Sequence, residues 1–401
     1  MDRVWSQAEP LIAAVAADVV AWRRHLHQHP ELSFHEVETA RFVADTLASF
    51  EGLAIERPTP TSVVARLHGA EPGRVLALRA DIDALPIAEE NPVPYRSRRA
   101  GVMHACGHDG HTAMLLGAAK VLCALRHHLR GEVRFIFQHA EEVLPGGAQE
   151  LVEKGVLAGV DLILGAHLWS PLALGRIGVK PGALMAAPDT FRITIHGKGG
   201  HAALPHETID PILVGAQVVT ALHHIVSRRV DPLAPFVVSV TRFAAGTADN
   251  VVPETAELTG TVRTFDPALR DEAPRWMEQV AQGVAAAYGA SCDVEYRRGY
   301  HPVINDEASA RWLREVLEEV FGPGVVVDAV PTMGGEDFSA YQQQVPGVFF
   351  FIGVRDEAAA SVYPHHHPRF NIAEAALPMG VKAFVAAAVR YLGTADPPSG
   401  T

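Results

Sequence analysis

Hydrophobic and polar positions repeat with two different periods along the first 180 residues of the chain. Apolar residues recur about every 3.6 positions in 9–28 and 35–50, which predicts amphipathic helices. Shorter runs, such as 61–67 and 74–80, are almost continuously apolar or β-branched and predict buried strands. The alternation continues with a helix over 113–129, a strand over 132–138, a helix over 147–154 and a strand over 160–167. Strands of this kind separated by helices predict a parallel or mixed sheet covered on both faces.

A second pattern occupies the middle of the chain. It predicts a strand, a helix, two strands, a helix and a last strand, at 190–197, 208–226, 236–243, 254–265, 270–289 and 291–298. This β-α-β-β-α-β order is that of ferredoxin-like domains, and about 110 residues is a normal domain size. Afterwards the first pattern resumes, with a helix at 306–321, a strand at 347–353 and a helix at 373–393. We therefore predict an α/β protein in which a mixed-sheet domain, 1–184 and 299–401, carries an inserted ferredoxin-like (βαββαβ) domain, 185–298.

Composition narrows the classes to which the protein can belong. Its 401 residues with 48% hydrophobic content can form two cores. The formal net charge is −12, which argues against nucleic acid as a partner. The three cysteines, an odd number, do not indicate a disulfide framework and suit a reducing compartment. Neither a signal-peptide pattern nor an apolar run of roughly 18 residues is visible. We expect a cytoplasmic protein with no membrane partner.

Polar side chains follow several of the predicted strands at the point where each strand should end. Asp81 and Asp83 come after the strand at 74–80, Glu141 and Glu142 come after 132–138, and His167 ends 160–167. Ligands of open α/β sheets bind at the carboxyl ends of the strands. A histidine run in a proline-rich loop, 363–370, could fold over the same edge. The pattern therefore indicates a functional site at this edge of the sheet.

The stretch "MHACGHDGHT", 103–112, carries the densest set of potential metal ligands. If the segment is extended, Cys106 and His108 project to the same side and can hold one ion or a close pair. We expect Asp109 or Thr112 to cap the helix that follows. Thiolate, imidazole and carboxylate are the usual ligands of zinc and also suit related transition metals.

The adjacent Glu141 and Glu142 should point different ways in an extended chain, so that one can bind metal while the other acts as a general base. Ordinary explanations stay open at this point. A lone cysteine is usually a small buried hydrophobe. Neighbouring glutamates are usually exposed charge, and three successive histidines can form a solvated turn.

Eight motifs together resemble a known family. They occur in the order "RADIDALP", "MHACGHDGHT", "FQHAEE", "GAH", "GKGGHAALPH", "NVVPETAELTGTVRTF", "GGEDFSAY" and "HHHPRFNIAEAALP". The set resembles the metal-dependent amidohydrolase peptidases that include hippurate hydrolases, N-acyl-amino-acid amidohydrolases and plant auxin-conjugate hydrolases. This resemblance covers nearly the whole chain. It implies a catalytic α/β domain with two divalent metal ions per subunit (Zn, Mn, Co or Ni) and a ferredoxin-like lid and dimerisation domain.

Carried over motif by motif, the resemblance implies a role for each of a set of residues. The metal ligands would be Cys106, His108, Glu142, His167 and His366. Glu141 would be the general base, and Asp81 would orient a ligand. Arg79 stands where related metallopeptidases have a histidine ligand, so it cannot bind metal.

The resemblance also implies a substrate and an assembly. The substrate would be a small N-acyl amino acid, contacted by Asn250 and Arg263 and by the segment 334–337 that contains Gly335. His201 would stabilise the oxyanion in a site of the neighbouring subunit, in a homodimer or a tetramer. The alternatives are a dipeptidase or carboxypeptidase on the same scaffold, and a non-catalytic metal-binding protein.

Overall fold

A computed structural model describes residues 2–393 of the chain, which form two compact units. Of these residues, 2–184, 304–330 and 337–393 belong to unit 1, and 185–303 and 331–336 belong to unit 2. Because each unit has its own hydrophobic core, the expectation of two cores agrees with the structure.

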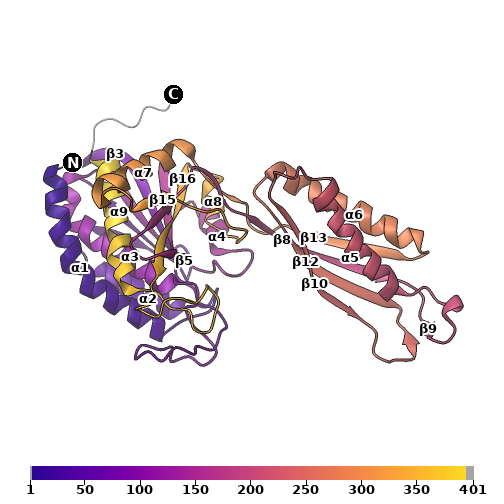
Figure 1. The fold of residues 1–401 in the computed structure, drawn as a ribbon. Coiled ribbons are helices and arrows are strands. Elements are labelled where there is room, and N and C mark those ends of the chain that lie inside the picture. Colours follow the sequence, from indigo (N-terminus) through magenta and orange to yellow (C-terminus); the bar gives the residue numbers. More distant parts are fainter. Residues whose placement is uncertain (1, 394–401) are drawn as a thin grey trace. The chain divides into compact units, whose positions relative to one another are not determined.

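Unit 1 is built around a mixed eight-stranded sheet (Figure 1). Its strand order is β1-β2-β4-β3-β5-β16-β6-β15, with parallel pairs β4/β3, β3/β5, β5/β16 and β6/β15. The strands are β1 (Leu53–Glu56), β2 (Val63–His68), β3 (Glu71–Asp81), β4 (Arg130–Gln138), β5 (Leu162–Ala173), β6 (Ile177–Val179), β15 (Val326–Asp328) and β16 (Gly347–Arg355). The helices are α1 (Asp2–Gln28), α2 (Val37–Ala48), α3 (His108–Leu125), α4 (Gly147–Glu153), α7 (Glu307–Phe321), α8 (Ser339–Gln342) and α9 (Leu377–Leu392).

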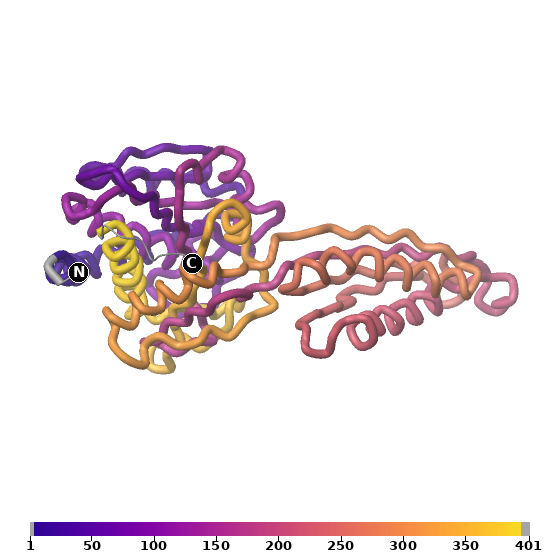
Figure 2. Tube along the Cα trace, turned by 90° about the horizontal axis from the view of Figure 1, so that it is seen from above, coloured from indigo at the N-terminus to yellow at the C-terminus, as the bar shows by residue number. Residues whose placement is uncertain are grey.

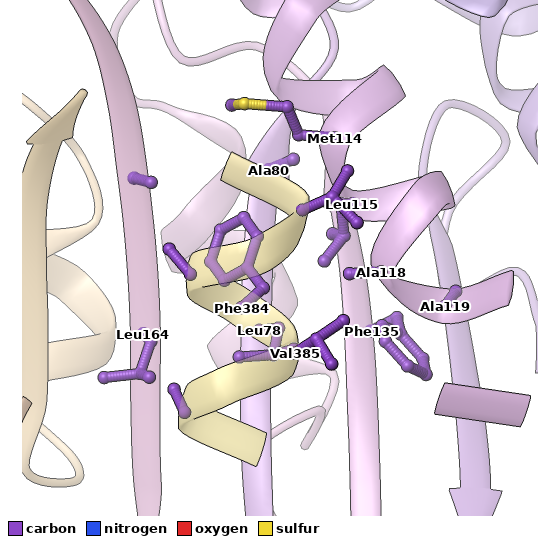
Figure 3. Close-up of a cluster of buried hydrophobic side chains, with 14 of the residues drawn as sticks. Leu78, Ala80, Met114, Leu115, Ala118, Ala119, Phe135, Leu164, Phe384 and Val385 are labelled. Atoms are coloured by element: carbon purple, nitrogen blue, oxygen red, sulfur yellow. The ribbon is translucent and has the colours of Figure 1, made fainter. Parts of the chain in front are cut away.

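Helices cover the sheet of unit 1 on both faces. Phe350 of β16 contacts Phe384 of α9, whereas its neighbour Phe349 contacts Phe338 at the start of α8. Because successive strand residues point to opposite faces, α9 and α8 lie on opposite sides of the sheet. Figure 3 shows the core on the α9 side, where α3 and α9 pack on the apolar faces of β3 and β4. The long α1 packs outside them, against α3 and α9 (Figures 1 and 2).

Unit 2 contains a four-stranded antiparallel sheet in the order β10-β12-β8-β13. Its elements are β8 (Ala187–His196), β9 (Gly200–His201), α5 (Pro211–Arg228), β10 (Phe236–Ala245), β11 (Val251–Val252), β12 (Thr255–Thr264), α6 (Pro267–Ala287) and β13 (Ser291–Arg297). Two further strands, β7 (Gly182–Met185) and β14 (Val303–Asn305), lie at the boundary, mostly in unit 1, and pair with each other. Figure 2 traces the stretch 185–303 from magenta to orange.

Local sequence explains where the helices of unit 2 begin. Asp210 and Asp266 are each followed by a proline at the first helical position, and each side chain accepts hydrogen bonds from the first backbone N–H groups. Aspartate is a good N-cap and proline is tolerated at this position because its missing N–H would be unpaired there. One face of α5 and one face of α6 pack against the sheet. Strands β9 and β11 pair with each other beyond the end of β8.

The boundaries of unit 2 differ from the expected 185–298. Residues 299–303 belong to unit 2 because Gly299 donates its N–H to Asp189 and accepts a hydrogen bond from Arg270. Residues 331–336 also belong to it because Ala186 donates to the carbonyl of Gly334. The chain therefore passes between the two units four times, at 184/185, 303/304, 330/331 and 336/337.

Two helical stretches are long and apolar enough, by composition, to cross a membrane, which differs from the expectation that none would be. They are Val4–Gln28, which is mostly exposed, and Glu374–Leu392, which is mostly buried. Core helices of globular proteins meet the same criterion, and both stretches pack into unit 1 through α1 and α9.

Candidate metal centre

The polar residues predicted at strand ends meet at one edge of the sheet in unit 1. Strands β4, β3 and β5 are parallel neighbours, so their carboxyl ends lie side by side. Asp81 ends β3, the pair Glu141 and Glu142 follows β4, and His167 lies in β5. These residues therefore lie near one edge of the sheet of unit 1.

The segment that carries Cys106 and His108 is a tight turn and not the extended strand that we expected. Gly107 has φ 97°, a left-handed conformation that glycine adopts without steric cost, and His108 is already the first residue of α3. Neither expected cap is used. Asp109 instead accepts hydrogen bonds from Arg23 and His27, and Thr112 donates to the carbonyl of Asp81.

Donor atoms of the five expected ligands lie close together and form two groups. One group is Cys106, His108 and His167, and the other is Cys106, Glu142 and His366. Within each group the donor atoms all lie within 4.8 Å of one another. Cys106 belongs to both groups, and its Sγ lies 3.4 Å from Nε2 of His167. The two groups of donors could each hold a divalent cation.

The histidine triplet reaches the site through His366. Its φ is 65°, which is uncommon for a residue other than glycine, and its N–H donates to the carbonyl of Ala105 at 2.8 Å. This places Nε2 of His366 at 3.2 Å from Oε1 of Glu142. The third histidine of the run, His367, stacks on Tyr363 and belongs to neither group of donors.

Two carboxylates orient the imidazoles of the site. Asp83 accepts from Nδ1 of His108 at 3.0 Å, so Nε2 of that ring faces the other donors. Asp83 also accepts from the Ser33 hydroxyl at 2.7 Å and from the N–H of Glu142 at 3.0 Å. Although burial opposes ionisation, these contacts hold the pKa of Asp83 below its usual value. The sequence places Asp83 after a strand, but nothing in the local sequence predicts its three hydrogen bonds.

The second carboxylate, Asp81, hydrogen-bonds to His111, which is not one of the five expected ligands. It accepts from Nδ1 of His111 at 2.6 Å, and Nε2 of His111 accepts from the N–H of Leu168 at 2.9 Å. Both nitrogens of His111 are therefore used, so it cannot also bind a cation. Arg79 donates to Asp81 at 2.8 Å and to Asp337 at 2.9 Å, which agrees with its exclusion as a ligand.

The residues fit a divalent cation. Nε2 of His108 is buried and has no hydrogen-bond partner among the described residues, which is costly unless something else binds it. Cys, His and Glu donors are the set that zinc and related metals take in proteins. Burial and the carboxylates of Glu142 and Glu141 raise the pKa of the Cys106 thiol well above the usual value. A cation among these carboxylates would oppose them and favour the thiolate.

The expected general base lies beside the donor groups. Glu141 is 7% exposed, and a carboxylate oxygen lies within 4.8 Å of the donor atoms of His108 and Glu142. The preceding Ala140 has φ 50°, so the chain turns sharply after β4 and is not extended as we expected. The expected strand alternation is therefore absent here, and carboxylate oxygens of Glu141 and Glu142 lie within 4.8 Å of each other.

The remaining expected residues all belong to unit 2, where they form two separate sets. His201 pairs with Val251 in the β9/β11 ladder, and Asn250 accepts from the N–H of Ala202. Arg263 donates to the carbonyl of Met333, and its strand partner is Pro188. Gly335 also lies on Pro188, since a Cβ there would come 2.5 Å from the proline ring.

These two sets lie at opposite ends of β12. Arg263 is eight strand steps from Thr255, and the ladder of His201 lies beyond Thr255. At about 3.3 Å per step the separation is about 26 Å or more. A dipeptide-sized molecule spans about 7 Å. His201 and Arg263 of one chain therefore cannot contact the same small substrate.

Comparison with known proteins gives a consistent family. Residues 77–390 match the sequence model of peptidase family M20/M25/M40. An N-acyl-L-amino acid amidohydrolase from Geobacillus stearothermophilus is 61% identical over 75% of this chain and 82% of its own length. Thermostable carboxypeptidase 1 of Saccharolobus solfataricus is 41% identical over 93% of this chain and 95% of its own.

A crystal structure agrees with the sequence relatives. The Bacillus subtilis YXEP protein, a dinuclear metal binding peptidase from the M20 family, has a TM-score of 0.83 and 41% identity to this chain. The similarity covers 95% of this chain and 99% of that one. The chain therefore belongs to peptidase family M20/M25/M40, as its motifs indicated.

Proposed function

We propose that this protein hydrolyses the amide bond of N-acyl-L-amino acids and releases a carboxylic acid and a free amino acid. The observation that carries the proposal is the position of Cys106 in two donor groups, with the buried carboxylate of Glu141 beside them. The 61% identity to an N-acyl-L-amino acid amidohydrolase supports the substrate class. A purely metal-binding protein would have no use for the additional carboxylate.

In this proposal Cys106, His108, Glu142, His167 and His366 hold two divalent cations. The mixed donors suit Zn, Mn, Co or Ni, and the dinuclear relative supports the number. The cations supply Lewis-acid polarisation of the amide carbonyl. Glu141 takes a proton from the attacking water and passes it to the leaving nitrogen of the amino acid, and Asp83 keeps the ring of His108 in one orientation.

Replacing Glu141 by Gln tests the proposed base. The variant keeps the shape of the side chain but cannot accept the proton, so turnover should fall about 10²–10⁴-fold while two cations per chain are retained. Hydrolysis of N-acetyl and N-benzoyl amino acids and the metal content of the same sample are the measurements. Near-normal kcat at full metal content would remove Glu141 from the role of base.

We further propose that unit 2 is a ferredoxin-like lid through which two chains form a homodimer. The element order and the strand order β10-β12-β8-β13 support the first part. The distance between His201 and Arg263 supports the second, because one substrate can meet both residues only if they come from different chains. His201 would donate to the oxyanion of the partner's site, close to Asn250 of its own chain. Arg263 and Gly335 would contact the substrate from the other end of the unit.

Mixing of inactive subunits tests the assignment of His201. A dimer with His201→Ala in one chain and Glu141→Ala in the other has one site with both residues intact if His201 acts in trans, and none if it acts in cis. Verified mixed dimers should regain up to half of the activity of the wild type. Failure to regain any activity would overturn the trans arrangement.

The similarity to the Saccharolobus carboxypeptidase supports an alternative substrate class, peptides. A panel of N-acetyl amino acids, N-benzoyl amino acids and dipeptides separates the two classes by their kcat/KM values. We expect the acyl amino acids to be preferred, and a preference of tenfold or more for dipeptides would favour the alternative.

The three free cysteines fit the cytoplasm that we propose as the compartment.

A further inference from the structure

We propose that His365, the first residue of the histidine triplet, is a positioning residue that ties the loop of His366 to the strand of His167 through the carbonyl oxygen of Leu168. The inference rests on the metal centre proposed above. It assigns to His365 a role that differs from those of its two neighbours, one an expected ligand and the other stacked on Tyr363.

The backbone N–H and C=O of Leu168 join three histidines from three segments. Its N–H donates to Nε2 of His111 at 2.9 Å. Its carbonyl oxygen lies 2.9 Å from Nδ1 of His167 and 3.0 Å from Nε2 of His365. Because a carbonyl oxygen can only accept, both of these ring nitrogens must carry a hydrogen.

These hydrogen positions fix the tautomers of two rings. His167 carries its hydrogen on Nδ1, so the lone pair on Nε2 faces Sγ of Cys106 at 3.4 Å. His365 carries its hydrogen on Nε2, so its Nδ1 must accept, and the Ser170 hydroxyl lies 3.2 Å from it. The chain Ser170–His365–Leu168–His167 therefore presents the donor atom of His167 in the direction that metal binding requires.

Packing holds His365 in this position. Its ring centroid lies 4.8 Å from that of Trp169 and 5.1 Å from those of Phe370 and His167. The next residue, His366, has its left-handed backbone fixed by the hydrogen bond to Ala105, next to Cys106. The loop is thus anchored at two points, and loosening the His365 anchor should move His366 away from Cys106 and His167.

Two variants of His365 separate the hydrogen bond from the packing. His365→Phe keeps a ring between Trp169 and Phe370 but cannot donate to Leu168. His365→Gln keeps an N–H at about the reach of Nε2. His367→Phe is the matched control, since it places the same substitution in the same loop and preserves stacking on Tyr363.

The measurement is the affinity of each protein for Zn²⁺ alone, by competition with a chelator, together with the absorption spectrum of the Co²⁺-loaded form. Wild type, His367→Phe and His365→Gln should bind two ions with similar affinities and give similar spectra. His365→Phe should bind at least one ion about 10–100-fold more weakly, with an altered Co²⁺ spectrum. Ser170→Ala should weaken binding in the same direction, which keeps the test available if His365→Phe does not fold.

Unchanged affinity and spectrum in both His365→Phe and Ser170→Ala would overturn the inference. Equal losses in His365→Phe and His365→Gln would also overturn it, because only packing would then matter. If the wild type itself binds no Zn²⁺, the proposed function fails before the role of His365 is reached. If His365→Phe binds two ions with the affinity and the spectrum of the wild type, the proposed function stays intact and only this inference is removed.

Discussion

Asp83→Asn is the substitution for which the structure gives the sharpest expectation. Asp83 is fully enclosed and accepts from His108, Ser33 and the N–H of Glu142. Asparagine has almost the same shape, but one of its two terminal groups is an NH₂ that can only donate. Two of the three donors that face Asp83 belong to proposed metal ligands, so the amide cannot satisfy both ends of the network.

Each orientation of the new amide harms the metal centre in its own way. If the NH₂ group faces His108, Nδ1 must accept, and the ring hydrogen moves to Nε2, where it covers the lone pair meant for a cation. If the NH₂ group faces Glu142, two donors oppose each other, and an unpaired buried N–H costs about 1–3 kcal/mol. Either result should weaken divalent metal binding about 10–100-fold, which corresponds to about 1.4–2.7 kcal/mol.

The assay is competition for Zn²⁺ between the protein and a chelator, with circular dichroism as a check of folding. Asp293→Asn is the matched control, since Asp293 pairs with His196 at 2.9 Å in unit 2 but is largely exposed. It should leave the affinity unchanged. A folded Asp83→Asn protein that binds Zn²⁺ like the wild type would refute the reasoning, because the tautomer of His108 would then not depend on Asp83.

Two further predictions concern stability. Gly117→Ala in α3 would place a methyl group 2.6 Å from the stiff side chain of Val19, so it should lower the free energy of unfolding, measured by urea titration, by about 1–3 kcal/mol. Gly283→Ala in α6 is the control, because its methyl group would have no atom within 4 Å, and it should be neutral or stabilising. Burial and Arg23 lower the pKa of His27, but Asp109 and Glu89 outweigh both, so that the pKa lies above 6.5. The contribution of protonated His27 to stability is therefore complete below pH 6.5 and is lost as the pH rises through the raised pKa. His27→Gln should flatten this part of the curve of unfolding free energy against pH, and an unchanged slope would contradict the assignment.

Strand ends were the part of the site that the sequence predicted best. Asp81 ends β3, Glu141 and Glu142 follow β4, and the parallel pairing of these strands brings their carboxyl ends together. His167 was expected at a strand end, but β5 continues six residues beyond it. His366 is different, because a loop about 200 residues further along the chain can be assigned to the same edge only by resemblance to a family.

Local geometry around the ligands could not be predicted. The turn at Gly107 and the left-handed backbone at Ala140 depend on tertiary packing, so the expected extended segments were wrong. Asp109 looks like a helix cap in sequence, but Arg23 and His27, more than 80 residues away, bind it instead. For the same reason the placement of 331–336 in unit 2 has no signal in the sequence, since its hydrogen-bond partners include Ala186 and Arg263, which lie far earlier in the chain.

The four passages of the chain between the units have a consequence for protein engineering. A simple insertion can be cut out at two points and expressed alone, but here 185–303 would leave without the six residues 331–336. The N–H of Ala186 would lose the carbonyl of Gly334, Arg263 would lose that of Met333, and Pro188 would lose the cover of Gly335. An isolated unit 2 should therefore be complemented by a synthetic peptide of this sequence, so that the fold contains a natural split-protein pair.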